Sequence, residues 1–345
     1  MRYIIHGAGG VGCTIGGRLF RHGHDVALIC RGEHLAAIRR DGLTLKIPGE
    51  VMRLPIPAVG HPRELRYGPG DVVIVAMKTQ DTAAALDDLR AAGAGERTPV
   101  ICAQNGVENE RQAFRRFSNV YGLVTRLPAV FVQPGVVLNH ATPVGGVLDL
   151  GRYPEGVDHL VMMVVRDLAS AGFRARAEER VMRWKYAKLI RNLNNGLTAI
   201  CGADLQAPEF SKALADEAYA CYEAAGIDYA TDEEERGRRA DGGYHLEAID
   251  GDALAGNSTL QSLQRGLSTV ETDYLNGEIA LLGRMHGVPT PHNVVVQRVT
   301  AAFAREGRRP GEMSIEELSE LVRQEAGDTT SSRAGALATE PRGVT

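Results

Sequence analysis

The chain has 345 residues, 44% of them hydrophobic and 24% charged, which is an ordinary globular composition and a length typical of two domains. The formal net charge of −4 excludes a dedicated nucleic-acid-binding protein, because such proteins carry a strong basic excess. No apolar run approaches the ~18 residues that cross a bilayer, and the first residues enter a strand pattern at once, which leaves no room for a signal peptide.

Short apolar runs alternate with helical patterns through the first half of the chain. Strands are predicted at 2–6, 25–30, 71–77 and 99–103, and helices at 11–22, 34–40 and 82–92. A strand pair is predicted at 43–47 and 51–58, further strands within 120–151, a helix at 156–171 and a last strand at 173–177. This alternation predicts a parallel, doubly wound sheet.

From residue 179 to about residue 326, almost every segment has helical periodicity. Helices are predicted at 180–200, 209–225, 259–286, 292–306 and 314–325. The sequence therefore predicts an α/β fold, with an N-terminal Rossmann-type doubly wound sheet (1–178) followed by an all-α domain (179–326). We expect the helical domain to bind substrate, and its apolar helices either pack on a second subunit in a homodimer or complete the core. Residues 327–345 are poor in apolar side chains, which predicts a disordered tail.

One stretch, 236–257, is rich in glycine and charge and separates two predicted helices. Loops of this length are uncommon and are often lids or binding loops. A plain insertion without a role explains the composition equally well, so both interpretations stay open.

The five cysteines do not indicate a disulfide framework or a zinc site, because their number is odd and no two form a CxxC pair. Most lie in apolar or glycine-rich runs, which is typical of reduced thiols inside the cell. We therefore expect a cytoplasmic protein without membrane or nucleic-acid partners. The residues are Cys13, Cys30, Cys102, Cys201 and Cys221.

A glycine-rich turn follows the first strand and opens the first helix, in the form GxGxxG. Gly7 allows a tight turn, Gly9 lets a pyrophosphate approach the backbone, and Gly12 lets the helix pack on the strand. The free N–H groups and the partial positive charge of the helix N-terminus favour phosphate. The sequence therefore predicts a dinucleotide site, with contacts from Gly7, Ala8, Gly9, Gly10, Val11 and Gly12.

The end of the second strand indicates which dinucleotide binds. An NAD site carries an acidic residue there for the ribose diol, whereas this strand is followed by Arg31. A guanidinium can pair with a 2′-phosphate, so NADP is predicted over NAD. Arg39 and Arg40 are alternatives, Glu33 argues against the assignment, and a solvated Arg31 without a role is the simplest other explanation.

Two further strand ends carry polar side chains that can face the cofactor. Lys78 follows the strand at 71–77 and Asn105 follows the strand at 99–103. Ligands of doubly wound sheets bind outside the carboxyl ends of the strands. The alternative is that both residues only terminate their strands.

A polar stripe runs along the first helix of the helical part. At about 100° per residue, Lys188, Asn192 and Asn195 share one side of this helix. Periodicity alone favours a solvated face of an amphipathic helix. A lysine with two short amides would equally suit a 2-keto acid, because the ammonium can protonate the carbonyl oxygen and the amides can orient the substrate.

A second polar cluster opens the helix predicted at 259–286. Ser258 or Thr259 is either a helix N-cap or a substrate contact. Glu271 lies further along, and alone it would be one more solvated helical glutamate.

Taken in order, these residues resemble the ketopantoate (2-dehydropantoate) 2-reductase family over about residues 1–306. The matching stretches are the glycine turn, Lys78, Asn105-Gly106, Trp184 to Ala199 with Lys188, Asn192 and Asn195, Asn257-Ser258, Glu271 to Gly277, and His286 to Pro291. The resemblance implies NADPH as hydride donor and a substrate cleft between a Rossmann domain and a helical domain.

By the same resemblance each polar residue acquires a role. Lys188 would be the general acid, and Asn192, Asn195 and Ser258 would bind the keto acid. Glu271 would lie beside cofactor and lysine, with Lys78 and Asn105 lining the nicotinamide side.

The chain also departs from the family pattern. The second asparagine of the helix comes one residue early, so Asn194 and Asn195 both stay candidates, and Lys185 competes with Lys188. The stretch at 236–257 is longer than expected, which favours a paralogue with a substrate other than ketopantoate. Two competing functions are an NADP-dependent dehydrogenase of another hydroxy acid or an imine, and a non-catalytic NADP(H) sensor.

Overall fold

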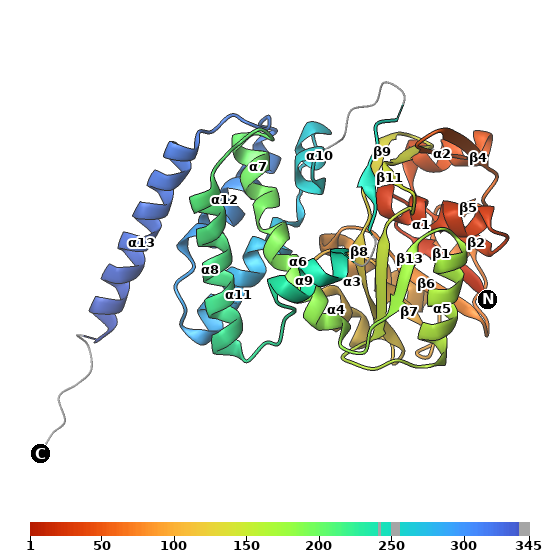
Figure 1. Ribbon diagram of the computed structural model, residues 1–345, viewed down its shortest axis with the longest axis horizontal. Coiled ribbons are helices and arrows are strands. Elements are labelled where there is room, and N and C mark those ends of the chain that lie inside the picture. Colours follow the sequence, from red (N-terminus) through yellow and green to blue (C-terminus); the bar gives the residue numbers. More distant parts are fainter. Residues whose placement is uncertain (241–242, 250–255, 338–345) are drawn as a thin grey trace, which may run out of the picture. The chain divides into compact units, whose positions relative to one another are not determined.

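The computed structural model describes residues 1–240, 243–249 and 256–337 (Figure 1). The chain forms two compact units, the first from Met1–Lys188 and Tyr229–Ala255, the second from Leu189–Asp228 and Gly256–Thr345. The predicted α/β fold, a Rossmann-type sheet followed by helices, is confirmed. No helix in the described ranges combines the length and the apolar character needed to cross a membrane.

An eight-stranded sheet forms the centre of the first unit. Six neighbouring strands, from β8 to β5, run parallel, whereas β12 pairs antiparallel with β8 and β13 runs parallel to β12. The strands across the sheet are β13 (Arg174–Ala177), β12 (Val147–Arg152), β8 (Val120–Arg126), β7 (Val100–Cys102), β6 (Asp71–Val75), β1 (Arg2–His6), β2 (Asp25–Ile29) and β5 (Ala58–Val59).

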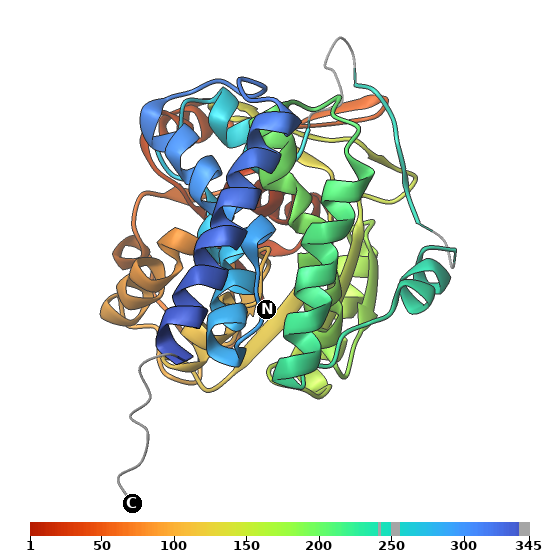
Figure 2. The ribbon, with the colours of Figure 1, turned by 90° about the vertical axis from the view of Figure 1, so that its left-hand side faces the viewer.

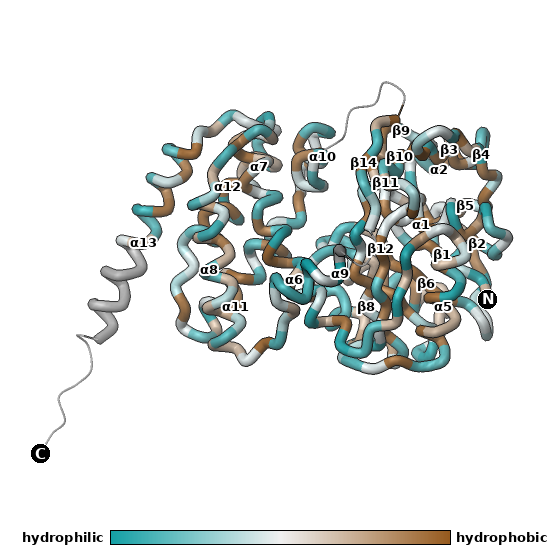
Figure 3. Tube along the Cα trace, in the orientation of Figure 1, coloured by the Kyte–Doolittle hydropathy of each residue, from teal (hydrophilic) through white to brown (hydrophobic). Residues whose placement is uncertain are grey.

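Both faces of this sheet are buried, as the apolar runs of its strands require. Along β1, Tyr3 and Ile5 join one hydrophobic cluster and Ile4 joins another on the opposite face. Figure 3 shows the apolar character of these central strands. Helices α1 (Gly10–Arg21) and α5 (His159–Ser170) cover the first face, and α3 (Thr82–Ala91) and α4 (Asn109–Phe114) cover the second.

The remaining strands of the first unit form two small sheets. The predicted pair at 43–47 and 51–58 is confirmed as β3 (Leu43–Ile47) and β4 (Glu50–Leu54), and it continues into β10 (Val136–Asn139) and β9 (Ala129–Gln133). This four-stranded sheet packs on α1. A two-stranded sheet joins β11 (Ala141–Thr142) to β14 (His245–Leu246). Helix α2 (Gly32–Asp41) follows β2.

The second unit is helical. Helices α8 (Pro208–Ala225), α12 (Pro291–Glu306) and α13 (Ile315–Leu337) run roughly side by side (Figure 2). The other elements are α7 (Asn194–Cys201), α10 (Ser258–Gln264), a 3₁₀ helix (Glu271–Tyr274) and α11 (Asn276–His286). Helix α6 (Val181–Asn192) contains the boundary between the units, after Lys188.

Two predicted helices are divided in the structure. The helix predicted at 180–200 becomes α6 and α7, but Leu193 between them keeps helical angles (φ −59°, ψ −30°) and its N–H still bonds to Leu189, so the predicted stripe survives. The prediction of one helix at 259–286 is wrong. Helix α10 ends at Gln264 because Gly266 adopts a positive φ of 67°, the conformation that commonly terminates helices.

The sequence predicts irregular structure at 236–257 and at 327–345. Part of each segment forms a helix or a strand instead. Helix α13 continues through residues 327–337, the first part of the predicted tail, while 338–345 lie outside the described residues. In the glycine-rich stretch, α9 (Asp232–Ala240) extends past residue 236 and β14 pairs with β11. Residues 241–242 and 250–255 of that stretch lie outside the described residues.

Candidate active site at the carboxyl ends of the central strands

The glycine turn between β1 and α1 has the conformation that its sequence predicts. Gly7 has φ +97°, and a Cβ there would lie 2.3 Å from the Met77 nitrogen. A Cβ on Gly12 would lie 2.4 Å from the Gly7 oxygen, whereas Gly9 has nothing within 4 Å of its Cβ position. Helix α1 begins at Gly10 without a side-chain cap. The turn therefore offers open space and an uncapped helix N-terminus, which suit a bound phosphate.

The three candidate arginines differ in what they contact. Arg39 pairs with Glu64 at 2.9 Å, and Arg40 pairs with Asp41 at 2.6 Å. Arg31, the exposed N-cap residue of α2, makes no side-chain hydrogen bond or ion pair with any residue that the structure describes. Of the three, Arg31 can pair with a ligand phosphate without first losing another partner.

A histidine precedes the glycine turn at the end of β1. Burial lowers the pKa of His6 to about 4, the Asp88 carboxylate opposes this shift, and the Arg31 guanidinium adds to it. His6 is therefore neutral at pH 7 and adds no positive charge beside the glycine turn.

Lys78 lies half-buried beyond the end of β6, where a short 3₁₀ turn (Thr79–Asp81) begins. That turn and the loop after β7 are joined by Asn109 of α4. The Asn109 amide donates to the Thr79 hydroxyl (3.1 Å) and to the Asn105 backbone oxygen (2.9 Å) and accepts from the Thr82 hydroxyl (2.8 Å). Asn109 is fully buried, so these bonds hold the loops after β6 and β7 together.

The structure brings Lys188 and Asn105, both predicted site residues, into contact. The Lys188 ammonium donates to Asn105 Oδ1 at 2.7 Å, to Thr125 Oγ1 at 3.1 Å, and to the Thr125 backbone oxygen. Asn105 follows β7 and Thr125 lies near the end of the neighbouring parallel strand β8. Sequence reasoning missed Thr125, although it belongs to the polar carboxyl end of its strand, the same signal that marked Lys78 and Asn105. The ammonium is thus held at the carboxyl edge of the sheet, where ligands bind in this fold.

The competing lysine has a different environment. Lys185 is 3% exposed, and its ammonium forms an ion pair with Glu110 and a 3.1 Å bond to the Gln104 backbone oxygen. Burial raises the pKa of the Glu110 carboxyl, and the ammonium opposes the shift. Lys188 is only half-buried, so of the two lysines it is the one that a substrate can reach.

Among the asparagines of the second unit, Asn192 ends α6 and Asn194 begins α7. The side-chain oxygens of both are buried and accept no hydrogen bond from the described residues. Asn195 is 8% exposed. Unpaired buried acceptors call for an explanation, and a ligand donor is one.

The N-cap of α10 is Asn257, so the alternative interpretation of Ser258 or Thr259 as the N-cap is wrong. Its Oδ1 accepts from the backbone nitrogens of Thr259 and Leu260, both at 3.0 Å. Ser258 is half-buried and Thr259 is 2% exposed, so Ser258 is the more accessible of the two. Glu271 is buried in the 3₁₀ helix before α11 rather than in a long helix.

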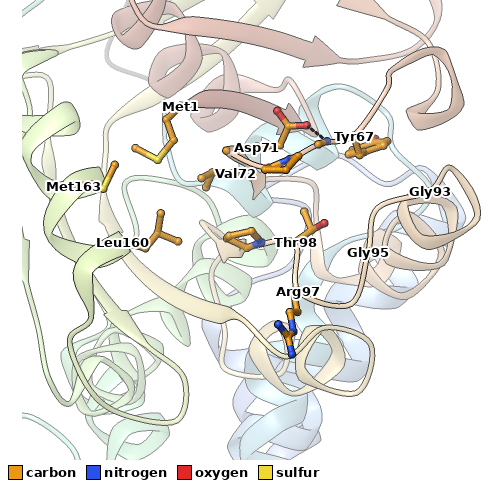
Figure 4. A pocket seen from close by; sticks show the side chains of 14 residues that line it. Met1, Tyr67, Asp71, Val72, Gly93, Gly95, Arg97, Thr98, Leu160 and Met163 are labelled. Carbon is orange, nitrogen blue, oxygen red and sulfur yellow. Dashed lines mark hydrogen bonds between the residues drawn. The ribbon is translucent and has the colours of Figure 1, made fainter.

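A cavity of about 660 Å³ lies at the opposite, amino end of the central strands (Figure 4). Met1, Asp71 and Pro99, which begin or precede β1, β6 and β7, line it together with Leu160 and Met163 of α5. Its walls are mostly apolar, and Asp71 already pairs with Arg2. It is therefore separate from the polar groups at the carboxyl edge. No group of acidic, histidine or cysteine side chains suited to a metal ion is present among the described residues.

Two family models match the chain, "Ketopantoate reductase PanE/ApbA" over residues 3–155 and its C-terminal counterpart over 180–304. A 2-dehydropantoate 2-reductase of Mesorhizobium japonicum is 30% identical over 323 residues, which cover 84% of this chain and 94% of that protein. The one of Pyrococcus horikoshii is 28% identical over 310 residues, which cover 88% and 97%.

Two solved structures extend the comparison. A PanE/ApbA family ketopantoate reductase from Ralstonia eutropha JMP134 has a TM-score of 0.73 at 28% identity, covering 89% of this chain and 99% of that one. A ternary structure of D-mandelate dehydrogenase with NADH and anilino(oxo)acetate has a TM-score of 0.76 at 23% identity, with the same coverage. The second likeness is one of fold.

Proposed function

The chain belongs to the ketopantoate reductase PanE/ApbA family, and from this we propose that it reduces a 2-keto acid, ketopantoate or a close analogue, with NADPH. The observation that carries the proposal is the Lys188 ammonium held on Asn105 and Thr125 at the carboxyl edge of a sheet that has a GxGxxG turn. The relatives named 2-dehydropantoate 2-reductase support the same substrate class.

The glycine turn fits a dinucleotide because Gly9 leaves open space and α1 has an uncapped N-terminus. Gly7 to Gly12 would hold the pyrophosphate, Arg31 the 2′-phosphate, and Lys78 and Asn105 the nicotinamide side. Bound NADPH supplies the hydride. This leaves the protein to bind the keto acid and to deliver one proton.

In the proposed mechanism Lys188 delivers that proton to the carbonyl oxygen as the hydride reaches the carbon. Acceptors on Asn105 and Thr125 orient the ammonium, and its bond to the Thr125 hydroxyl, at 3.1 Å, is longer than its 2.7 Å bond to Asn105. Exchange of that bond for one to the substrate would leave the contact with Asn105 intact. Glu271 would act beside the lysine.

The substrate contacts are proposed from the second unit. The oxygens of Asn192 and Asn194, which accept no bond from the described residues, would accept from a hydroxyl group of the ligand, and their amide nitrogens would donate to its carboxylate. Asn195 and Ser258, with Thr259 as the less accessible alternative, complete the set. We retain residues 179–326 as the substrate-binding and dimerisation domain in this proposal.

The central test is Lys188→Ala. Loss of the proton donor is expected to lower kcat at least 100-fold, while the Kd for NADPH changes less than threefold, because general acids contribute 10²–10⁴ in rate (order of magnitude). The control is Lys212→Ala, an exposed lysine paired with Asp216. A panel of ketopantoate, bulkier aryl keto acids and imines identifies the substrate. Normal turnover of Lys188→Ala would refute the assigned role, and NADPH binding without turnover of any substrate would favour a sensor.

Cofactor choice is tested with Arg31→Ala. Loss of a charged bond to the 2′-phosphate is expected to lower the ratio of kcat/KM for NADPH to that for NADH by about 10–100-fold. Arg40→Ala, which removes an arginine already paired with Asp41, is the matched control. If the ratio is unchanged in Arg31→Ala, Arg31 does not set the cofactor preference. Either another residue then selects NADPH, or the protein prefers NADH.

A further inference from the structure

We propose that the buried pair of Lys185 and Glu110 positions the proton donor, by fixing α6 against the loop that carries Asn105. This inference rests on the proposed function and goes beyond it, since it assigns a role to two residues that touch neither substrate nor cofactor.

The first argument is the spacing of the two lysines. Lys185 and Lys188 are three residues apart on α6, so they lie on the same side of the helix. Lys185 bonds to the backbone oxygen of Gln104, and Lys188 bonds to the side chain of Asn105, the next residue. Adjacent residues of one loop are therefore held by successive turns of one helix. If the bond between Lys185 and Gln104 is lost, α6 is no longer fixed against this loop. The position of Lys188 relative to Asn105 is then no longer fixed either.

The second argument concerns the other side of that loop. Glu110, the partner of Lys185, lies on α4 next to Asn109, which bonds to the backbone oxygen of Asn105. The loop is thus anchored to α4 at Asn109, and α4 is anchored to α6 at Glu110. This closed ring of contacts leaves Asn105 little freedom to move relative to Lys188.

The third argument is packing and charge. Glu110 is fully buried, Lys185 is 3% exposed, and a Cβ on Gly122 of β8 would lie 3.4 Å from Glu110 Oε1 and 3.5 Å from Lys185 Cδ. The pair packs against this glycine together with Val181 of α6, and both side chains are buried. Two charges buried this deeply are retained only with good mutual geometry, and well-packed apolar residues can usually replace them without loss of stability. A role in positioning explains why this buried site holds an ion pair rather than two apolar side chains.

The size of the effect follows from the chemistry. A flexible lysine must hold its ammonium near the reacting oxygen, and a displacement of about 1 Å at a catalytic group can cost on the order of 100-fold in rate. The proposed pyrophosphate and 2′-phosphate contacts, at Gly7 to Gly12 and Arg31, lie outside this ring of contacts, and Asn105 would add one contact on the nicotinamide side. Positioning should therefore appear mainly in kcat and only weakly in cofactor affinity.

The experiment uses the full-length double variant Lys185→Met/Glu110→Gln, which removes both charges and leaves neither ion buried alone. We expect kcat to fall at least tenfold, with the KM of the keto acid and the Kd of NADPH within threefold of wild type. The control is Tyr3→Phe, which deletes a buried 2.8 Å bond to Asp167 in the same unit and should lower Tm without changing kcat.

A second readout does not need turnover. The chain has five lysines, Lys46, Lys78, Lys185, Lys188 and Lys212, so the Lys188 signal can be assigned in protein labelled with [¹⁵Nζ]lysine. In the double variant this signal should shift and its hydrogens should exchange faster, because the bond to Asn105 is no longer held. Tyr3→Phe should leave it unchanged.

The outcomes separate the two proposals. Wild-type kcat and an unmoved Lys188 signal in the double variant would overturn the positioning role. Equal losses in kcat, NADPH affinity and Tm would also overturn it, by making the pair a purely structural element. If the wild type reduced no keto acid, the proposed function would fail, while the Lys188 signal would still decide whether the pair sets the place of the ammonium.

Discussion

At the scale of single residues, the glycines of the first turn have different physical reasons to be glycine. Gly7 needs a positive φ, and at Gly12 the space for a Cβ is taken by the Gly7 oxygen. Gly9 meets neither constraint, because its φ is −87° and its Cβ position is open. The fold therefore requires Gly7 and Gly12, whereas Gly9 is explained by a ligand that approaches the backbone closely.

This difference gives a paired prediction. Gly9→Ala should cost at most about 1 kcal/mol of unfolding free energy, as a poorer N-cap residue, yet raise the Kd for NADPH at least tenfold. Gly12→Ala should cost about 3 kcal/mol or more, because backbone would have to move. Urea denaturation and fluorescence titration measure the two quantities. Unchanged NADPH affinity in Gly9→Ala would contradict a pyrophosphate at this turn.

At the scale of elements, capping side chains determine where helix α10 of the second unit begins, and the hydrophobic periodicity of the sequence does not indicate them. Asn257 caps α10, and its amide also donates to the Thr198 hydroxyl of α7. One asparagine thus starts a seven-residue helix and joins it to α7. A helix this short is marginal alone, so its cap and its packing determine its stability.

We expect Asn257→Ala to lower the unfolding free energy by about 1–2 kcal/mol, the usual cost of losing an N-cap together with its neighbour contact. Asn257→Asp keeps the acceptor for the Thr259 and Leu260 nitrogens but loses the donor to Thr198, so its loss should be smaller. Denaturation in urea ranks the variants. If both substitutions cost the same, the bond to Thr198 rather than the cap would be the stabilising contact.

At the scale of the whole molecule, the first unit is built from two separate stretches of chain. Helix α9 returns to it through Arg238, which bonds to Asp149 at 3.1 Å and to Glu178 at 2.5 Å and stacks 3.5 Å from the Trp184 ring centre. Asp149 is fully buried, and Arg126 is its other cation. Part of the charge balance inside the Rossmann unit therefore comes from residues more than fifty positions beyond its last strand.

A fragment of residues 1–178, the domain that the sequence predicts, should consequently not fold stably. It would leave the buried Glu110 without Lys185, and an orphaned buried charge costs about 3–5 kcal/mol against a total stability of roughly 5–15 kcal/mol. Asp149 would lose Arg238 and keep its ion pair with Arg126, which weakens the fragment further. Circular dichroism and thermal melting provide the measurement. A cooperative melt with retained NADPH binding would instead support the boundary at 178.

The sequence alone determined the order of strands and helices, the doubly wound sheet and the glycine turn, because hydrophobic period and backbone freedom are local properties of the chain. It also singled out Lys188 and Asn105, though as separate candidates. Only the tertiary structure decided that they meet, 83 residues apart, that Thr125 joins them, and that Lys185 is buried on Glu110. Such contacts depend on which strands become neighbours and how a helix sits on their ends, and no periodicity along the chain records that.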